Sequence, residues 1–486
     1  MRRRKSRAEG PPLLPIKLDP VSNGEFEPRP PDPRIQAVQR LAHERAAEAA
    51  RRLGQSRREF LRSSCGAATV LLALNELGCG GGRYDVPREA ATEKAAADQA
   101  LGGKELIFDV QTHHVSGDRR WWEADVPTLA DFLRHTPKAK CGEPEWVGCF
   151  TRDPFVKDVF MDSDTRMGVL SALWGSPDIN AIHVEEAALT RERMAMMKGA
   201  PRLRIHGTVL PILYSTAQIR EQMQELAEKW DIAAWKLYPV WGPKKTGYRV
   251  DREPGAPVIE RAIELGRPLI AIHKGLPLAG MDPEFTRSHD IGPAARMFPR
   301  ATFLIYHSGW EADHAEGPYD PKSGRGVDAL IRSLEQNGIG RDGNVYAELG
   351  SIWRGVMGDP QQAAHVMGKL LRYLGEDRIL WGTDCIWYGS PQDQIQALRS
   401  FEITPEFQER FGYPALTREA KAKIFGKNAI RVYGIDEDEV RKATEWDPAA
   451  QAKAIYQEDP RPSHETRGPR TRREYAALLR ANRGLP

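Results

Sequence analysis

The feature that most constrains the fold of this 486-residue chain is an alternation of short apolar runs with amphipathic segments, beginning at residue 105. Short runs rich in Val, Ile, Leu and aromatic residues predict strands that are buried on both faces. The eight expected strands are 105–113, 168–173, 203–211, 232–239, 268–273, 302–307, 344–349 and 378–384. The expected helices between them include 184–198, 215–229, 256–265, 326–337, 360–374 and 391–401. This alternation predicts an α/β fold of the (β/α)8 TIM-barrel type with insertions.

The main alternative is an open, doubly wound sheet. That fold needs a glycine-rich phosphate turn after an early strand, and no such turn is present in the sequence. The barrel is therefore expected to span residues 105–435, after an N-terminal region, 1–104, and before a charged, helical C-terminal tail, 436–486.

Polar residues close four of the expected strands. His113, His273, His307 and Asp384 each stand at or next to the carboxyl end of a strand, where barrel active sites are built. One such histidine alone would usually be structural, but burying an imidazole costs free energy unless it is bonded, so the set indicates a site. Side chains alternate along a strand, so Gln111 is expected on the same face as His113. Imidazoles with one carboxylate are typical ligands of a catalytic divalent ion, zinc by default.

Five short motifs follow one another in a fixed order over about two-thirds of the chain. They are D-V-Q-T-H at 109–113, I-H-K-G at 272–275, Y-H-S-G at 306–309, W-G-T-D at 381–384 and F-G-K-N-A-I-R-V-Y-G at 425–434. Through them, residues 105–435 resemble the amidohydrolase superfamily, in particular the branch that contains aminocarboxymuconate semialdehyde decarboxylase and many metal-dependent hydrolases. The resemblance implies a metal-dependent barrel enzyme.

Carried over position by position, the resemblance implies roles for individual residues. His113 and His273 are expected to be metal ligands, and Asp384 a ligand and general base. His307 matches the histidine that polarises the reacting oxygen of the substrate. The chain departs from the family at Gln111, where the first histidine of H-x-H, or sometimes a glutamate, is usual. An amide oxygen is a weaker ligand than imidazole, so the affinity for the single divalent ion, Zn²⁺ or Mn²⁺, is left open.

The expected reaction is hydrolysis of a small carbonyl-containing substrate, aromatic or a lactone or amide, by a metal-activated water. The second hypothesis is non-oxidative decarboxylation at the same metal site, because hydrolysis and decarboxylation both need a Lewis acid, a base and a polarising imidazole. A non-catalytic ligand-binding barrel with a degraded metal site is the third.

Further side chains follow strand ends and are candidates for substrate contact. The candidates are Lys236, Trp310 and Trp387. Four more aromatic residues also follow strand ends: Tyr238, Trp241, Trp353 and Tyr388. Aromatic residues there can line a substrate pocket, or pack loops over the barrel rim. Some superfamily members carry a carboxylated lysine between two metals near Lys236, but the branch resembled here uses one metal, which favours a substrate-facing or structural lysine.

The N-terminal region contains segments of different composition. Residues 1–34 are rich in proline and basic residues and are expected to be disordered. Residues 35–62 are expected to form a polar helix. The sequence S-R-R-E-F-L-R at 56–62, an apolar run at 65–74 and a glycine-rich break at 78–82 resemble a twin-arginine export signal, followed by a linker, 83–104. The same residues can also be read as a charged helix before a small buried helix. Export to the periplasm through the twin-arginine machinery is therefore expected, with a cytoplasmic location as the alternative.

Composition limits the expected partners. The net charge is only +3, which argues against a polycation acting on nucleic acid, and no apolar run approaches 18 residues, which argues against an integral membrane segment in the mature protein. The expected partners are a small-molecule substrate and a second copy of the chain. Cys141 and Cys149 lie in the insertion after the first strand and can pair after export.

Overall fold

The computed structural model describes residues 13–19, 27–28, 32–78, 80–123, 130, 133–134, 139, 141, 143–196, 202–276, 282–458, 460 and 472–481. Its centre is an eight-stranded parallel sheet in sequential order. The strands are β2 (Phe108–Thr112), β3 (Met167–Leu170), β4 (Leu203–Thr208), β5 (Ala234–Leu237), β6 (Leu269–His273), β7 (Thr302–Tyr306), β8 (Val345–Glu348) and β9 (Ile379–Leu380). The predicted barrel is confirmed, and each expected strand overlaps an observed one; β3 begins one residue before the expected range.

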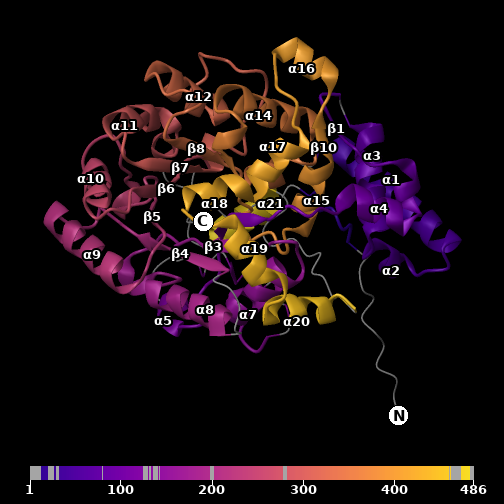
Figure 1. The fold of residues 1–486 in the computed structure, drawn as a ribbon, viewed down its shortest axis with the longest axis horizontal. Helices are drawn as coiled ribbons and strands as arrows, with labels where there is room; N and C mark the ends of the chain where they lie inside the picture. The colour runs from indigo at the N-terminus through magenta and orange to yellow at the C-terminus, as the bar shows by residue number, and fades with distance from the viewer. Residues whose placement is uncertain are drawn as a thin grey trace.

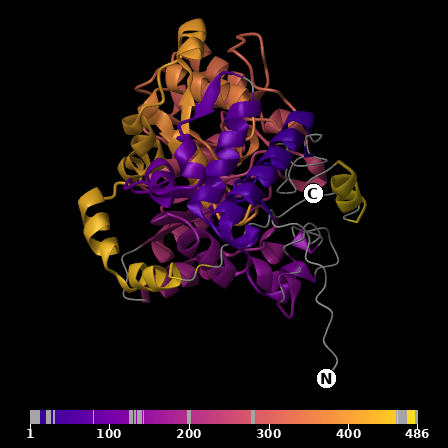
Figure 2. The same ribbon diagram turned by 90° about the vertical axis from the view of Figure 1, so that its right-hand side faces the viewer.

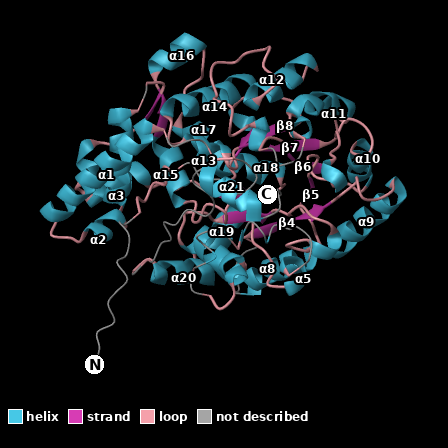
Figure 3. Cartoon of the chain, turned by 180° about the vertical axis from the view of Figure 1, so that it is seen from behind, coloured by secondary structure: helices cyan, strands magenta, loops and turns pink. Residues whose placement is uncertain are grey.

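The last strand meets the first. The amide of Val110 in β2 donates to the carbonyl of Trp381 at 3.0 Å, and Thr112 forms a parallel bridge with Cys385. Trp381 and Cys385 come shortly after β9 in the chain, and their contacts with β2 close the sheet into a barrel. Figure 3 shows the strands enclosed by helices.

Helices surround the barrel (Figure 1). In chain order after β2 they are α5 (Arg119–Trp122), α7 (Arg152–Phe155), α8 (Val184–Met196), α9 (Thr216–Lys229), α10 (Ala256–Glu264), α11 (Ile291–Met297), α12 (Gly326–Gln336), α13 (Ile352–Val356), α14 (Pro360–Tyr373), α15 (Gln392–Ser400), α16 (Pro405–Phe411), α17 (Arg418–Ala422), α18 (Asn428–Val432), α19 (Glu437–Glu445), α20 (Pro448–Tyr456) and α21 (Arg472–Ala481). Helix α10 illustrates why these segments are helices with one face against the barrel: its apolar Val258, Ile259 and Ala262 recur at helical spacing and are buried. None of the helices among the described residues combines the length and the apolar character needed to cross a membrane.

Strand β2 contains an irregularity that matters for the site. Phe108 and Val110 belong to the apolar cluster inside the barrel, as period-2 alternation requires. The pairing register with β3 shifts between Asp109 and Thr112, and Gln111 also reaches the interior, where its amide lies beside Asp384. The bulge thus places two consecutive side chains, Val110 and Gln111, on the inner face.

The N-terminal region folds against one side of the barrel (Figure 2). It comprises α1 (Pro33–Arg52), α2 (Arg57–Leu61), α3 (Ser64–Leu77), β1 (Gly82–Tyr84) and α4 (Lys94–Leu101), and β1 pairs antiparallel with β10 (Phe401–Ile403). The apolar run of the signal-like segment is helix α3, which has a largely buried apolar stretch, with Leu71 fully buried. This arrangement has the form of the charged helix followed by a small buried helix.

Two stretches of this region differ from expectation. Residues 13–19, expected to be disordered, bury Leu14, Ile16 and Leu18, and part of the expected linker forms α4. These residues are ordered because their three apolar side chains are buried and the backbone N–H of Lys17 donates to the distant Asp393 at 3.1 Å, a contact that composition does not reveal. Cys141 and Cys149 are joined in a disulfide.

Candidate active site

The four polar residues predicted from strand ends meet at one end of the barrel. His113 follows β2, His273 ends β6, His307 follows β7 and Asp384 lies beyond β9, and each is at least 98% buried. Nε2 of His113 lies 3.1 Å from Oδ1 of Asp384, and the rings of His273 and His307 are 4.7 Å apart between centroids. The structure thus brings the predicted residues together, and Gln111 joins them.

Asp384 is the centre of this network. Its carboxylate accepts hydrogen bonds from Nε2 of Gln111 at 3.2 Å and from the hydroxyl of Ser351 at 2.5 Å, in addition to the contact with His113. Burial raises the pKa of Asp384, but the interaction with His113, supported by the hydrogen bond from Ser351, outweighs burial and holds this pKa below its ordinary value. Asp384 is therefore ionised at neutral pH.

His307 is held in one orientation. Its Nδ1–H donates to the carbonyl of Gly350 at 2.8 Å, which leaves a lone pair on Nε2, 3.3 Å from the amide nitrogen of Gln111. Burial lowers the pKa of His307 to about 4, so the ring is neutral. In the neutral ring Nε2 is a hydrogen-bond acceptor, and it becomes a donor only after it takes up a proton.

Sequence reasoning missed the carboxylate that supports His307. Glu348, at the end of β8, accepts the backbone N–H of His307 at 3.0 Å and that of Gly350 at 2.6 Å. It thereby fixes a turn in which His307 has a left-handed φ of 63°. Burial raises the pKa of Glu348 to about 8. An acidic residue at the end of an expected strand was the available signal.

The segment that follows β9 must leave room for the side chain of Glu348. A Cβ at Gly382 would lie 1.6 Å from its carboxylate oxygen, so only glycine fits there. A second buried acid, Asp109, accepts hydrogen bonds from Thr383, and burial raises its pKa to about 7.

The three predicted substrate-contact residues are all buried. Trp387 stacks on His113 with ring centroids 5.7 Å apart. The ammonium of Lys236 lies inside the barrel, 3.7 Å from the ring centroid of Tyr306 and 4.8 Å from that of Tyr238. Trp310 lies beyond β7, on the lining of a cavity described below.

The donors present fit a divalent ion only in part. Among the described residues, no group of three or more His, Cys, Asp or Glu side chains is arranged to hold a metal. His113 and Asp384 are nevertheless poised for a cation. Nδ1–H of His113 donates to the carbonyl of Ser171 at 3.0 Å, which in the neutral ring leaves the Nε2 lone pair facing the carboxylate. Two acceptors at 3.1 Å need a proton or a metal ion between them.

Gln111 is the remaining candidate metal ligand. Its Oε1 is buried and has no hydrogen-bond partner among the described residues. The amide nitrogen of Gln111, however, is the atom that faces Asp384, at 3.2 Å. Oε1 would have to take its place for Gln111, His113 and Asp384 to hold a divalent ion together. Nε2 of His273 is engaged instead, at 3.1 Å from the carbonyl of Leu276. His273 is thus adjacent to the set, with Nε2 turned towards the backbone.

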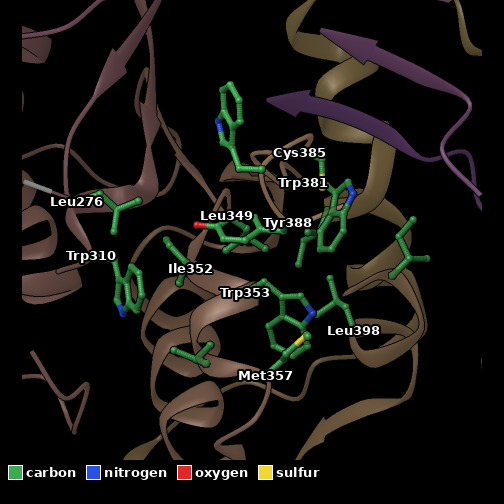
Figure 4. Packing of buried hydrophobic residues seen from close by; sticks show 14 of the residues in the cluster. Leu276, Trp310, Leu349, Ile352, Trp353, Met357, Trp381, Cys385, Tyr388 and Leu398 are labelled. Atoms are coloured by element: carbon green, nitrogen blue, oxygen red, sulfur yellow. The ribbon is translucent and has the colours of Figure 1, made fainter. Parts of the chain in front are cut away.

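A cavity of about 410 Å³ reaches this network from the side. Its lining includes Ser351, which bonds Asp384, and the hydroxyl of Tyr388 lies 2.7 Å from that of Ser351. Trp310 also lines the cavity, and Figure 4 shows Trp310 and Tyr388 with Leu349 and Ile352 between them. The Ser351 hydroxyl group thus links the cavity to the Asp384 carboxylate.

The closed parallel barrel is a (β/α)8 TIM barrel, and its carboxylate and three imidazoles lie at the strand ends, where active sites of this fold are built. The sequence model of the amidohydrolase family matches residues 162–435, more than half of the chain, and the chain belongs to this family. The match begins after β2, so it does not cover Gln111 and His113.

No curated protein matches the chain. Among solved structures, it is similar to 5-carboxyvanillate decarboxylase from Sphingomonas paucimobilis, with 15% identity, a TM-score of 0.42, and coverage of 68% of this chain and 100% of the other. For 2,6-dihydroxybenzoate decarboxylase from Rhizobium the identity is 14%, the TM-score 0.38 and the coverage 68% and 99%. For dihydroorotase from Campylobacter jejuni the values are 12%, 0.37, 68% and 84%.

Proposed function

We propose that the chain is a metal-dependent hydrolase that acts on a small carbonyl-containing substrate. The observation that carries the proposal is the position of the Asp384 carboxylate, which contacts His113, Gln111 and Ser351 at the end of the barrel where catalytic groups of this fold lie. His113, Asp384 and Gln111 would hold one divalent ion, zinc or manganese. When bound, such an ion would supply the Lewis acidity that makes water a stronger acid near neutral pH.

The residues of the chain have separate tasks in this reaction. Asp384 accepts a proton from the attacking water, and Ser351 keeps its carboxylate oriented. The neutral His307 takes up a proton from solvent at Nε2 and donates it to the oxygen on which negative charge develops, which returns the ring to its neutral form. Glu348 keeps the His307 turn in place through two backbone hydrogen bonds.

The test is a screen of esters, lactones, amides and phenolic acids with the wild type and three variants. Asp384→Asn and His307→Gln should each lower kcat by ~10²–10⁴, as expected for removal of an acid or base. Asp342→Asn changes an exposed carboxylate outside the site and should leave turnover unchanged. Hydrolysis that survives both site variants would contradict the proposal.

The same screen separates the alternative reactions. Release of CO₂ from phenolic acids, without any hydrolytic product, would replace hydrolysis by non-oxidative decarboxylation at the same residues. Ligand binding without turnover, and without an effect of chelators, would replace it by a binding barrel.

A further inference from the structure

Arg354 carries a buried positive charge beside the candidate active site. It lies on the short helix α13 and is 95% buried. One Nη2–H donates to the backbone carbonyl of Asp19 at 2.9 Å, and Nε has no hydrogen-bond partner among the described residues. The negative charges of Asp393 and Asp19 stabilise the guanidinium from a distance, but Asp393 is paired with Lys17 at 3.2 Å and Asp19 accepts a hydrogen bond from Gln39. A buried charge without a direct ionic partner is costly, so it indicates a ligand.

The guanidinium lines the cavity of about 410 Å³ that reaches the catalytic network. It lies 6.0 Å from the ring centroid of Tyr388, whose hydroxyl contacts Ser351 at 2.7 Å. Ser351 in turn donates to Asp384 at 2.5 Å. A group bound at Arg354 therefore lies along the cavity from the catalytic carboxylate, with the aromatic side chains of Trp310 and Tyr388 on its lining.

The other charged residues on the cavity lining have partners already. Arg472 is paired with Glu27 at 2.6 Å, and Asp313 with Arg325 at 2.5 Å. The remaining carboxylates accept hydrogen bonds: Asp19 from Gln39, Asp32 from the Arg34 amide and Asp359 from Gln362. Of the two described arginines on this lining, Arg472 has a direct ion pair, whereas Arg354 feels the charges of Asp393 and Asp19 without a direct ionic contact. The surrounding carboxylates disfavour a ligand with several negative charges.

We propose that this cavity binds a small monocarboxylate, with its carboxylate on Arg354 and its apolar part against Trp310 and Tyr388. The proposal rests on the proposed function, because it makes Arg354 the residue that orients a carboxylate-bearing substrate beside Asp384. Arginine suits the role, since its planar fork matches the two oxygens of a carboxylate.

The test measures equilibrium binding of benzoate and of its neutral isostere benzamide by isothermal titration calorimetry, with no turnover needed. The wild type should bind benzoate about tenfold or more tightly than benzamide, because a hydrogen bond to a charged group contributes ~1.5–3 kcal/mol. Arg354→Gln should abolish that preference, and Arg354→Lys should keep part of it. Arg341→Gln is the matched control: Arg341 also bonds backbone carbonyls, those of Leu371 and Arg372, but it does not line this cavity, and its loss should change nothing.

Equal affinity of the wild type for benzoate and benzamide, or no benzoate binding, would overturn the proposal. So would an Arg354→Gln variant that keeps the benzoate preference, because Arg354 would then only anchor residues 13–19 and the carboxylate would bind elsewhere, for example on a metal ion. If Arg354→Gln does not fold, the wild-type contrast and Arg354→Lys decide. A protein that binds benzoate through Arg354 but hydrolyses nothing would refute the proposed function and keep this inference.

Discussion

The imidazole of His113 lies between two hydrogen-bond acceptors: Nε2 is 3.1 Å from Oδ1 of Asp384, and Nδ1 is 3.0 Å from the carbonyl oxygen of Ser171. A neutral imidazole has only one N–H, so it satisfies only one of them. The ring must either carry a second proton or share a cation with Asp384. His113 and Asp384 together are therefore built to hold positive charge.

Metal binding follows from this relationship. Protein purified without chelators should hold about one zinc or manganese ion per chain, and Asp384→Ala and His113→Ala should each lose it. Gln111→His should bind zinc about tenfold more tightly, because imidazole is a better ligand than an amide oxygen. Elemental analysis and competition with a chelating dye measure both effects. A wild type that stays free of metal after reconstitution would mean that the His113–Asp384 pair holds a proton alone.

Acid should destabilise the protein through His365. Burial, followed by the charge of Lys369, lowers the pKa of His365 to about 4, whereas the unfolded chain titrates near the ordinary value of 6.5. Between these values the unfolded state binds a proton that the folded state does not, so stability falls as the pH drops from 6.5 towards 4. His365→Phe lacks this loss, although it also gives up the hydrogen bond to Tyr413.

Urea unfolding at a series of pH values measures this effect. The advantage of the wild type over His365→Phe should shrink as the pH falls through that window. A difference in unfolding free energy that stays constant with pH would show that His365 titrates alike in both states.

Helix α3 should contribute to the stability of the folded protein. Leu71 is fully buried in it, and Leu71→Ala should lower the unfolding free energy by ~2–5 kcal/mol. Leu77, in the last turn of the same helix, is 37% exposed, and Leu77→Ala should cost much less. Thermal and urea unfolding of the two variants compare them. Equal, small effects would mean that α3 packs only loosely on the barrel, as a removable leader would.

Thiol chemistry tests the disulfide. The chain has five cysteines, and pairing of Cys141 with Cys149 leaves three thiols. Denatured, unreduced protein should therefore react with three equivalents of a thiol reagent, and reduced protein with five. In native protein, Cys65 and Cys385 should react slowly, because both are buried. Five equivalents without reductant would exclude the bridge.

The sequence alone was sufficient for the barrel and for part of its site. Strands covered on both faces are nearly continuous apolar runs, so all eight were visible, and the carboxyl end of each strand has a fixed place in this fold. His113, His273, His307 and Asp384 could therefore be placed together before the structure was known. The orientations of the rings could not, because they depend on partners such as Ser171 and Gly350 from other strands and loops.

The remaining parts of the site depend on contacts between distant segments. The supporting role of Glu348, the bond from Ser351 to Asp384 and the exposure of Arg354 to a cavity have no periodic signature in the sequence. The packing of residues 13–19 on the barrel is of the same kind, since it joins Lys17 to Asp393 across 376 positions. Periodicity along the chain determines which elements form and where their ends lie. Only the tertiary structure decides which side chains meet there, because burial and hydrogen bonding are properties of neighbours in space.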